Sequence, residues 1–405
     1  MNNNQAQDSP LIDNLNDLDE LTNIPLGSQV NLVEWGLQKK YDSRYNIIKG
    51  HVEIKKKNET EYRQLNDYVL NSIMRDLAKN GIRCTAGLLA NILHSDFSEA
   101  YDLFKVYIKA LPEWDKIDRF EELAATVECE NKELWKKHLT KWIVAMIASL
   151  SESSVINHTV LVLVGAQGIG KTTWLLRLIP PELKEQAFMG FAHPDNKDTI
   201  VNLSECMLII LDELETMNRK GIGMLKELIT QSQIRVRRPY ARNAETLVRR
   251  ASFAGSVNST EFLNDFTGSR RFLCHEVKKV NYNHSINLNQ LYAQAYHLYN
   301  TKFQFWFNDN EIAEVARSND KFQVSTPEEE FLLQYFEPGS KGKGKFKAPA
   351  EIITFLQKVT QTKVALKNTI MGKSLTKNGF ERKKVGGRYG YYLLLKDKAV
   401  DYDEL

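Results

Sequence analysis

A glycine-rich segment is the part of this sequence whose residue types and spacing point most directly to chemistry. Residues 165–172 read GAQGIGKT and match the pattern GxxxxGK[ST] at every fixed position. Glycines let the backbone curl so that its N–H groups point at phosphate oxygens. The lysine adds an ammonium group near the β- and γ-phosphates, and the hydroxyl after it ligates Mg²⁺. The pattern therefore predicts a nucleotide site made by Gly165, Gln167, Gly168, Gly170, Lys171, Thr172 and Thr173.

An acidic pair follows an apolar run further along the chain. Residues 206–214 read CMLIILDEL, so that five apolar residues precede Asp212 and Glu213. We expect Asp212 to hold the Mg²⁺ shell through water and Glu213 to polarise the attacking water. Glu215 competes for the second role if the strand register shifts. A carboxylate pair on the surface at a strand end is the alternative.

A polar amide ends the third apolar run of this region. Residues 252–258 read SFAGSVN, which puts Asn258 at the carboxyl edge of a predicted strand. From there its side chain would position the lytic water near the γ-phosphate. The alternative is an Asx-turn residue with a purely local role.

Two adjacent arginines, Arg270 and Arg271, follow a Gly-Ser turn in the segment DFTGSRRF. Packing explains such a pair poorly. We therefore interpret one of them as an arginine finger that reaches a nucleotide in the same subunit or in a neighbouring one. A salt bridge to Asp265 or Glu261 is the alternative.

Two further segments are rich in basic residues. Residues 233–242 read QIRVRRPYAR and predict a hairpin that presents side chains to a phosphate backbone. The candidates on it are Arg235, Arg237, Arg238, Tyr240 and Arg242. Residues 341–390 carry 13 basic and two acidic side chains, which favours a polyanionic partner such as nucleic acid. In both places a solvated basic surface without a ligand is the alternative.

The end of the chain predicts a small helical unit that closes with a hairpin. The turn is GGR (386–388), between ERKKV and YGYYLLL. This ending resembles that of a winged-helix domain, whose wing would bring four basic side chains to DNA phosphates: Arg382, Lys383, Lys384 and Arg388. A packing module with a basic surface is the alternative.

Strands and helices must position these residues. The apolar runs 160–164, 207–211 and 253–257 suit buried strands, and periodic segments lie between them. We therefore predict an α/β fold with a parallel sheet. In the part of the chain before these runs, apolar residues recur mostly at helical spacing. The predicted domains are a flexible acidic tail (1–30), a helical N-terminal domain (31–150), a nucleotide-binding core (151–310) and a basic winged-helix-like C-terminal domain (311–405).

Composition excludes several classes of protein. The chain has 405 residues, a net charge of +3, 42% hydrophobic and 26% charged residues, which is typical of globular proteins. Collagenous, coiled-coil and largely disordered chains are thereby excluded. No apolar run is long enough to span a membrane, and the N-terminus lacks the pattern of a secretory signal. The four cysteines form no CxxC pair, so we expect neither a zinc site nor a disulfide framework, and a cytoplasmic location.

The order of these motifs resembles that of the virulence-associated E family of phage and genomic-island proteins. That family is similar to the superfamily 3 helicases and to the helicase half of viral primase-helicases. Residues 111–119, LPEWDKIDR, also resemble the family signature LPxWDGxDR, with Lys116 in place of the glycine. The resemblance covers roughly residues 60–280.

This resemblance implies a P-loop NTPase core with an AAA+-like parallel sheet. It implies that Lys171 and Thr172 bind ATP and magnesium, and that Asp212 and Glu213 form the hydrolytic pair. Asn258 would be the polar sensor, and Arg270 or Arg271 the finger that reaches the next protomer. Relatives in superfamily 3 form hexameric rings through which DNA threads past a basic hairpin.

We therefore expect an ATP-dependent DNA helicase or replication-initiation motor of a phage or mobile genetic element, acting on single-stranded or forked DNA as a hexamer. One alternative is a nucleotide-dependent switch that binds a partner protein. Another is a non-motor DNA-binding initiator whose recognition lies in residues 320–405. Only about 150 residues precede the glycine-rich loop, so we expect no fused primase; a separate primase or polymerase remains a possible partner.

Overall fold

A computed structural model describes residues 29–190, 196–217, 219–238, 243–263 and 269–396. The predicted acidic tail, apart from its last two residues, and the candidates Tyr240 and Arg242 lie outside these ranges. The chain forms two compact units. The first contains the described residues up to Asn258 together with Arg270–Ala316. The second contains the described residues of 259–269 and those from Arg317 onward.

A six-stranded sheet forms the centre of the first unit, in the order β5-β12-β6-β11-β8-β7. The three strands predicted from apolar runs are present and adjacent, which confirms an α/β fold with a parallel sheet. Every residue of these three strands is buried, as expected for a parallel sheet covered on both faces. Only β5 runs antiparallel to its neighbour. The strands are β5 (Val127–Cys129), β6 (Val160–Val164), β7 (Ala187–Met189), β8 (Leu208–Leu211), β11 (Ser252–Val257) and β12 (Phe272–Val280).

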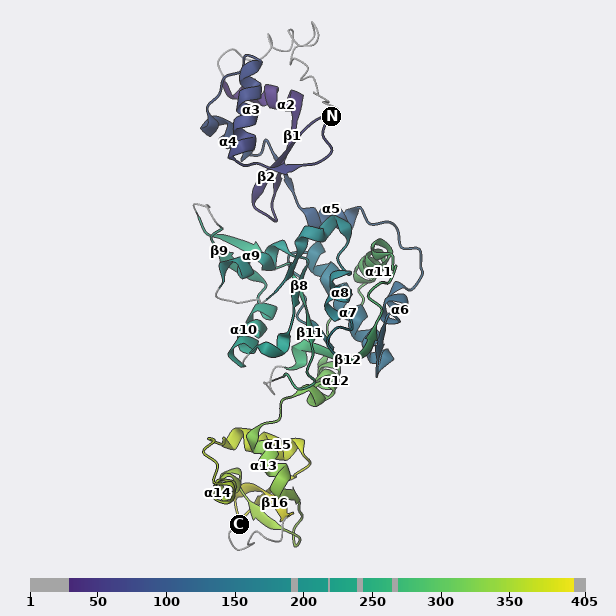
Figure 1. Cartoon of the computed structure of the whole chain (residues 1–405), viewed down its shortest axis with the longest axis vertical. Helices are drawn as coiled ribbons and strands as arrows, with labels where there is room; N and C mark the ends of the chain where they lie inside the picture. Colours follow the sequence, from purple (N-terminus) through teal and green to yellow (C-terminus); the bar gives the residue numbers. More distant parts are fainter. Residues whose placement is uncertain (1–28, 191–195, 218, 239–242, 264–268, 397–405) are drawn as a thin grey trace. The chain divides into compact units, whose positions relative to one another are not determined.

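Helices flank this sheet, with α9 and α10 on one side of the strands and α8 and α11 on the other (Figure 1). The longest helix, α7, is largely buried, and Trp142 on it donates a hydrogen bond to the Phe253 carbonyl of β11 over 3.1 Å. The helices are α5 (Leu103–Lys109), α6 (Arg119–Ala124), α7 (Lys132–Ser151), α8 (Lys171–Leu176), α9 (Lys197–Glu205), α10 (Arg219–Thr230), α11 (Leu288–Asn300) and α12 (Asp309–Asn319). Short 3₁₀ helices are η1 (Pro181–Gln186), η2 (Leu214–Thr216) and η3 (Ser269–Arg271).

Two smaller sheets belong to the same unit. A hairpin of β9 (Gln233–Val236) and β10 (Glu245–Val248) lies between β8 and β11 in sequence. Near the start of the chain, four strands in the order β3-β2-β1-β4 pack on helices, an arrangement that helical spacing alone did not predict. The strands β1 and β2 are short and polar, and only Val52 and Ile54 alternate inward on β2, which leaves a weak signal. The elements are α2 (Gln29–Lys40), β1 (Tyr41–Asn46), β2 (His51–Lys56), β3 (Arg63–Gln64), α3 (Asp67–Lys79), α4 (Ala86–Leu93) and β4 (Glu99–Tyr101).

The second unit has its own core of apolar side chains, among them Phe336, Leu356, Leu375 and Leu393. Three helices pack against a small antiparallel sheet in which β16 is central and pairs with β13, β14 and β15. The hairpin predicted at residues 386–388 is present, with Gly386 and Gly387 both at positive φ as a two-residue turn requires. The elements are η4 (Asp320–Phe322), α13 (Pro327–Tyr335), β13 (Phe336–Pro338), β14 (Lys345–Lys347), α14 (Pro349–Thr360), α15 (Asn368–Lys377), β15 (Arg382–Val385) and β16 (Arg388–Leu395).

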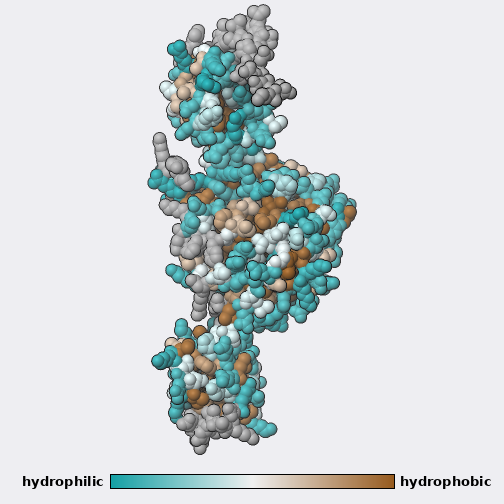
Figure 2. All heavy atoms as spheres, in the orientation of Figure 1, coloured by the Kyte–Doolittle hydropathy of each residue, from teal (hydrophilic) through white to brown (hydrophobic). Residues whose placement is uncertain are grey.

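Figure 2 shows a mainly hydrophilic surface, with hydrophobic side chains gathered over the part of the first unit where α8 and α11 lie. A hollow there is lined by Leu176, Ile179, Met189 and Ile286. Among the described residues, none of the helices combines the length and the apolar character that crossing a lipid bilayer requires.

Candidate functional site

The glycine-rich loop (165–172) connects the carboxyl end of β6 to α8. Gly168 and Gly170 have φ angles of +83° and +91°, which residues with a Cβ rarely adopt. A Cβ at Gly170 would also overlap the ring of Tyr282, and one at Gly165 would overlap the Val277 carbonyl. The loop conformation therefore requires its glycines. Of the other candidates, Gln167 and Thr173 are exposed.

Lys171 is buried, with 5% of its surface exposed, and its ammonium group is held by three oxygens. It donates to the carbonyls of Gly165 at 2.7 Å and Ala166 at 2.8 Å, and to Oδ1 of Asn258 at 2.9 Å. Burial lowers the pKa of Lys171, and the charges of Glu215 and Asp212 oppose this effect. The cation is thus held at the loop by neutral partners.

Three side-chain oxygens meet beside this lysine. Thr172 donates from Oγ1 to Oδ1 of Asp212 over 2.9 Å, and Ser256 donates from Oγ to the same oxygen over 2.5 Å. The two hydroxyl oxygens lie 3.2 Å apart. They come from α8, the end of β8 and the end of β11, which meet because parallel strands end at one edge of the sheet. Carboxylate and hydroxyl oxygens suit a hard cation such as Mg²⁺.

Ser256 is a site residue that the sequence interpretation missed. It is 3% exposed and stands near the end of the buried strand β11, whose other hydroxyl belongs to Ser252 at the start of the strand. It also precedes Asn258 by two residues, so both side chains lie on the same face of the strand. A hydroxyl in a buried strand, two positions before the polar end, is the signal that could have revealed it.

Of the two carboxylates considered for the second acidic role, Glu215 rather than Glu213 lies against β11. Glu213 is exposed, has a left-handed φ of +52°, and makes no side-chain hydrogen bond or ion pair with another described residue. Glu215 accepts a 2.9 Å hydrogen bond at Oε1 from the backbone N–H of Asn258. Its other oxygen, Oε2, is buried and has no partner among the described residues. The chain turns into η2 directly after Asp212, and this turn brings the later carboxylate to β11.

Arg270 and Arg271 lie at the opposite edge of the sheet. They precede β12, which runs parallel to β6 with Phe272 opposite Val160, whereas the glycine-rich loop follows the far end of β6. The five residues of β6 separate the two edges by about 16 Å at ~3.3 Å per residue. Consistently, burial lowers the pKa of His158, just before β6, and the charges of Arg249 and Arg271 lower it further. Arg270 and Arg271 therefore lie at the edge of the sheet opposite the glycine-rich loop of the same chain.

The basic hairpin β9–β10 presents some of its arginines and buries another. Arg235 and Arg237 are exposed, whereas Ile234 and Val236 alternate with them and are buried. Both exposed arginines thus lie on the solvent side of the hairpin.

Arg238 requires a correction, because it is only 8% exposed and fully engaged within the protein. Its guanidinium group donates to Glu245 at 2.7 Å, to Glu205, and to the carbonyls of Ile48 and Lys49 at 2.6 Å and 2.8 Å. It therefore fastens the β1–β2 turn to this hairpin and is a structural residue.

The second basic hairpin, β15–β16, exposes Lys383, Lys384 and Arg388 as predicted. Lys383 pairs with Glu381 at 2.5 Å, and Arg388 lies 3.5 Å from Glu351. Lys384 lies over the ring of Tyr389, 5.6 Å from its centroid. These cations are accessible, and two of them are partly balanced by carboxylates.

The fold and this cluster define a class of protein: a mixed α/β domain with a parallel sheet and a glycine-rich loop at its carboxyl edge. The virulence-associated protein E-like domain family matches residues 108–324, which is more than half of the chain. The chain belongs to this family.

One solved structure is similar in fold over almost the whole chain. The apo structure of the NrS-1 C-terminal region (305–718) matches 92% of this chain and 100% of its own, with 14% identity and a TM-score of 0.50. The A form apo structure of the same region matches 91% of this chain and 99% of its own, with 12% identity and a TM-score of 0.47. At such identities the likeness concerns the fold alone. The chain matches no curated protein.

Proposed function

We propose that this protein is an ATP hydrolase that works as a DNA helicase or replication-initiation motor of a phage or another mobile genetic element. The observation that carries the proposal is the convergence of Lys171, Thr172, Asp212 and Asn258 at one edge of three neighbouring strands. Membership of the virulence-associated protein E-like family supports a role related to phage replication.

The residues at this edge fit a nucleotide with a divalent cation. The loop carries left-handed glycines and a buried ammonium group, and the oxygens of Thr172 and Asp212 share one hydrogen bond. Mg²⁺ would be held by Thr172 and, through water, by Asp212; when bound, it neutralises charge on the phosphates. Lys171 would bind phosphate oxygens in exchange for its present carbonyl partners.

Hydrolysis needs a group that accepts a proton from water and a group that orients that water. Glu215 has the unpartnered carboxylate oxygen next to the end of β11, which makes it our candidate for the first role. Asn258 links Lys171 to the backbone that Glu215 holds, which makes it our candidate for the second.

An arginine at the far edge of the sheet can act only on the nucleotide of another copy. We therefore propose that ATP binds at subunit interfaces and that Arg270 or Arg271 completes the neighbouring site. Such head-to-tail contacts close into a ring, and a hexamer is the assembly we propose.

DNA would contact the exposed arginines of the β9–β10 hairpin, Arg235 and Arg237. In the second unit, three helices followed by the β15–β16 hairpin have the order of a winged-helix domain, and this hairpin would serve as the wing. Single-stranded or forked DNA is the substrate we propose.

The test is an ATPase assay with and without single-stranded DNA, combined with DNA binding at low salt. Wild-type protein should hydrolyse ATP faster with DNA, and Lys171→Ala should abolish hydrolysis. Lys109→Ala, an exposed lysine on α5, is the matched control and should behave as wild type. Equal ATP hydrolysis with and without DNA, together with no DNA binding, would overturn the proposal.

A further inference from the structure

Tyr282 lies directly on the glycine-rich loop, and the proposed function as stated so far gives it no role. It follows the end of β12 by two residues, and 39% of its surface is exposed. A Cβ at Gly170 would lie 2.2 Å from Cδ1 of the Tyr282 ring, so the ring contacts the glycine backbone. The ring therefore packs on the loop while part of its surface stays open to a ligand.

The order of the strands places Tyr282 on the side of the loop opposite the candidate catalytic residues. The loop follows β6, whose neighbours are β11 on one side and β12 on the other. Asp212 and Asn258 follow β8 and β11, so the γ-phosphate and Mg²⁺ of a bound nucleotide would lie on that side. A nucleotide extends from its γ-phosphate to its base. The base would therefore point across the loop towards the end of β12, where Tyr282 lies.

Two side-chain contacts fasten the segment 281–284 to α8 and to the residue that follows this helix. Arg177, directly after α8, donates a hydrogen bond to Oδ1 of Asn283 over 3.3 Å. The ring of His284 lies edge-on to the ring of Trp174 on α8, with 6.3 Å between the two centroids. The segment therefore has a defined place beside the loop, and recognition of a planar base requires such a fixed ring.

His284 lines the hollow that contains Leu176 and Ile286, and its two ring nitrogens are buried. Neither nitrogen makes a hydrogen bond with another described residue. Burial lowers the pKa of His284, and the charge of Arg177 lowers it further. The imidazole is therefore mainly neutral at pH 7, with one nitrogen as donor and the other as acceptor. Because buried polar groups without partners cost free energy, the two nitrogens favour a ligand with a complementary polar edge.

We propose that the adenine base of the bound nucleotide stacks on Tyr282 and directs its polar edge towards His284. This inference rests on the proposed function, because it assigns the base subsite of the same nucleotide site. The edge of adenine carries both a donor and an acceptor, which match the two nitrogens of a neutral imidazole. A purine also offers a larger ring surface for stacking than a pyrimidine does, so Tyr282 should favour adenine over uracil.

The experiment is isothermal titration calorimetry of the full chain, in the presence of Mg²⁺, with three probes: ADP, UDP and pyrophosphate. Wild-type protein should bind ADP about tenfold more tightly than UDP. Tyr282→Ala should weaken ADP binding about tenfold to hundredfold and leave pyrophosphate binding unchanged, because only the base loses a contact. Tyr282→Phe keeps the ring and should retain the ADP affinity. His284→Ala should weaken ADP binding about threefold to tenfold, and His284→Gln, which keeps a donor and an acceptor, should retain most of it.

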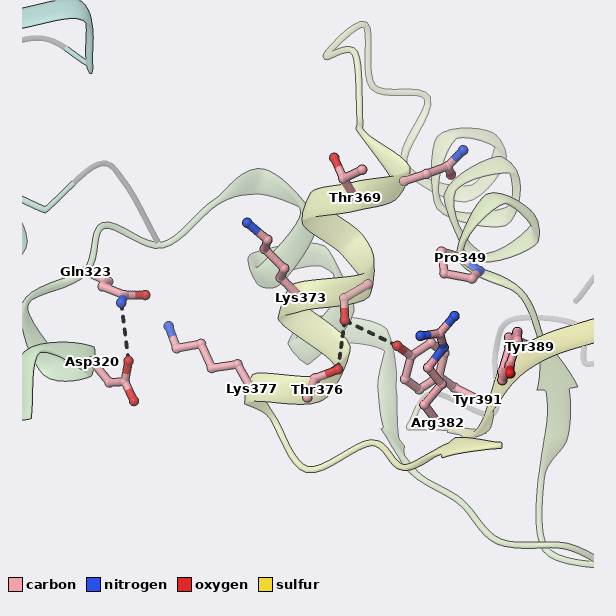
Figure 3. A pocket seen from close by; sticks show the side chains of 12 residues that line it. Asp320, Gln323, Pro349, Thr369, Lys373, Thr376, Lys377, Arg382, Tyr389 and Tyr391 are labelled. Atoms are coloured by element: carbon pink, nitrogen blue, oxygen red, sulfur yellow. Dashed lines mark hydrogen bonds between the residues drawn. The ribbon is translucent and has the colours of Figure 1, made fainter. Parts of the chain in front are cut away.

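Tyr389→Ala is the matched control and should bind ADP as wild type does. Tyr389 is an exposed tyrosine that borders a hollow of the second unit (Figure 3). Unchanged ADP binding in Tyr282→Ala would overturn the proposal, as would an equal loss of ADP and pyrophosphate affinity, or equal wild-type affinity for ADP and UDP. If no probe binds, the proposed function falls as well, whereas base-dependent binding without ATP hydrolysis would contradict the motor function alone.

Discussion

At the scale of single residues, the candidate active site is an arrangement of oxygens around Asp212 and Lys171. Thr172 and Ser256 both donate to one carboxylate oxygen of Asp212, which restricts its orientation. Asn258 connects the lysine to the backbone that Glu215 holds. These contacts connect side chains from different elements. A small displacement of one side chain would therefore change the hydrogen bonds of the others.

The two neighbouring carboxylates can be separated by mutation. Glu215→Gln should lower kcat for ATP hydrolysis by about 100-fold or more, because it removes the carboxylate next to Asn258. Glu213→Gln is the matched control and should retain most of the activity, since Glu213 is exposed and left without a described partner. Steady-state ATPase kinetics of both variants test this assignment. A larger loss of kcat in Glu213→Gln than in Glu215→Gln would contradict it and favour Glu213.

Substitution of Ser256 should weaken the binding of Mg²⁺ more than the binding of the nucleotide. Ser256→Ala removes a hydrogen bond to a charged acceptor, worth about 1.5–3 kcal/mol, so Asp212 becomes less well oriented. We expect about tenfold more Mg²⁺ to be needed for half-maximal binding of a fluorescent ATP analogue. Ser256→Thr should retain normal Mg²⁺ dependence, and Ser204→Ala, which removes a hydroxyl elsewhere, is the control. An unchanged Mg²⁺ titration in Ser256→Ala would contradict this role.

At the scale of elements, the β9–β10 hairpin shows how alternation divides basic residues between two tasks. Arg235 and Arg237 are exposed, whereas Arg238, two residues beyond β9, is buried and reaches the β1–β2 turn. Sequence composition alone treats all three as equivalent cations. Their positions, on the strand or beyond its end, determine which of them are exposed and which is buried.

Arg238→Ala should therefore destabilise the fold, while Arg235→Ala should weaken DNA binding. Removing Arg238 leaves Glu205 without its ion-pair partner in a site where burial already raises the pKa of that carboxyl group. A loss of about 3–5 kcal/mol in the free energy of unfolding is expected. Arg235→Ala should change that free energy by less than about 0.5 kcal/mol and lower the salt slope of DNA binding by about one. Denaturant unfolding and anisotropy test the pair, and equal stability of both variants would contradict the assignment.

At the scale of the whole molecule, the chain leaves the first unit directly after Asn258 and returns at Arg270. The segment between them contributes Phe262 and Leu263, whose backbone N–H groups both bond to the carbonyl of Phe322 in the second unit. Asn258, the candidate sensor, thus directly precedes this segment, and Arg270, a candidate finger, directly follows it. The candidate finger lies at the edge of the sheet opposite the glycine-rich loop, and the proposed activity would therefore require assembly.

Mixing two inactive variants tests that requirement. Lys171→Ala lacks the loop cation, and Arg270→Ala/Arg271→Ala lacks the finger, so each alone should be inactive. In mixed assemblies about a quarter of the interfaces would combine an intact loop with an intact arginine pair, and ATPase activity should recover to that extent. Mixtures of either variant with itself are the control. No recovery, with assembly verified by particle size, would contradict action between subunits.

Sequence by itself determined the α/β class, the three buried strands, the glycine-rich loop and the terminal hairpin. These features are local: a continuous apolar run, a spaced set of glycines and a two-glycine turn each specify their own backbone. Tertiary structure alone decided that Glu215 rather than Glu213 reaches β11, that Ser256 binds Asp212, and that Arg238 is buried. It also decided that Arg270 and Arg271 lie at the far edge of the sheet, and it revealed the small sheet near the start of the chain. These outcomes depend on which strand lies beside which and where the chain turns, and residues distant in the sequence determine both.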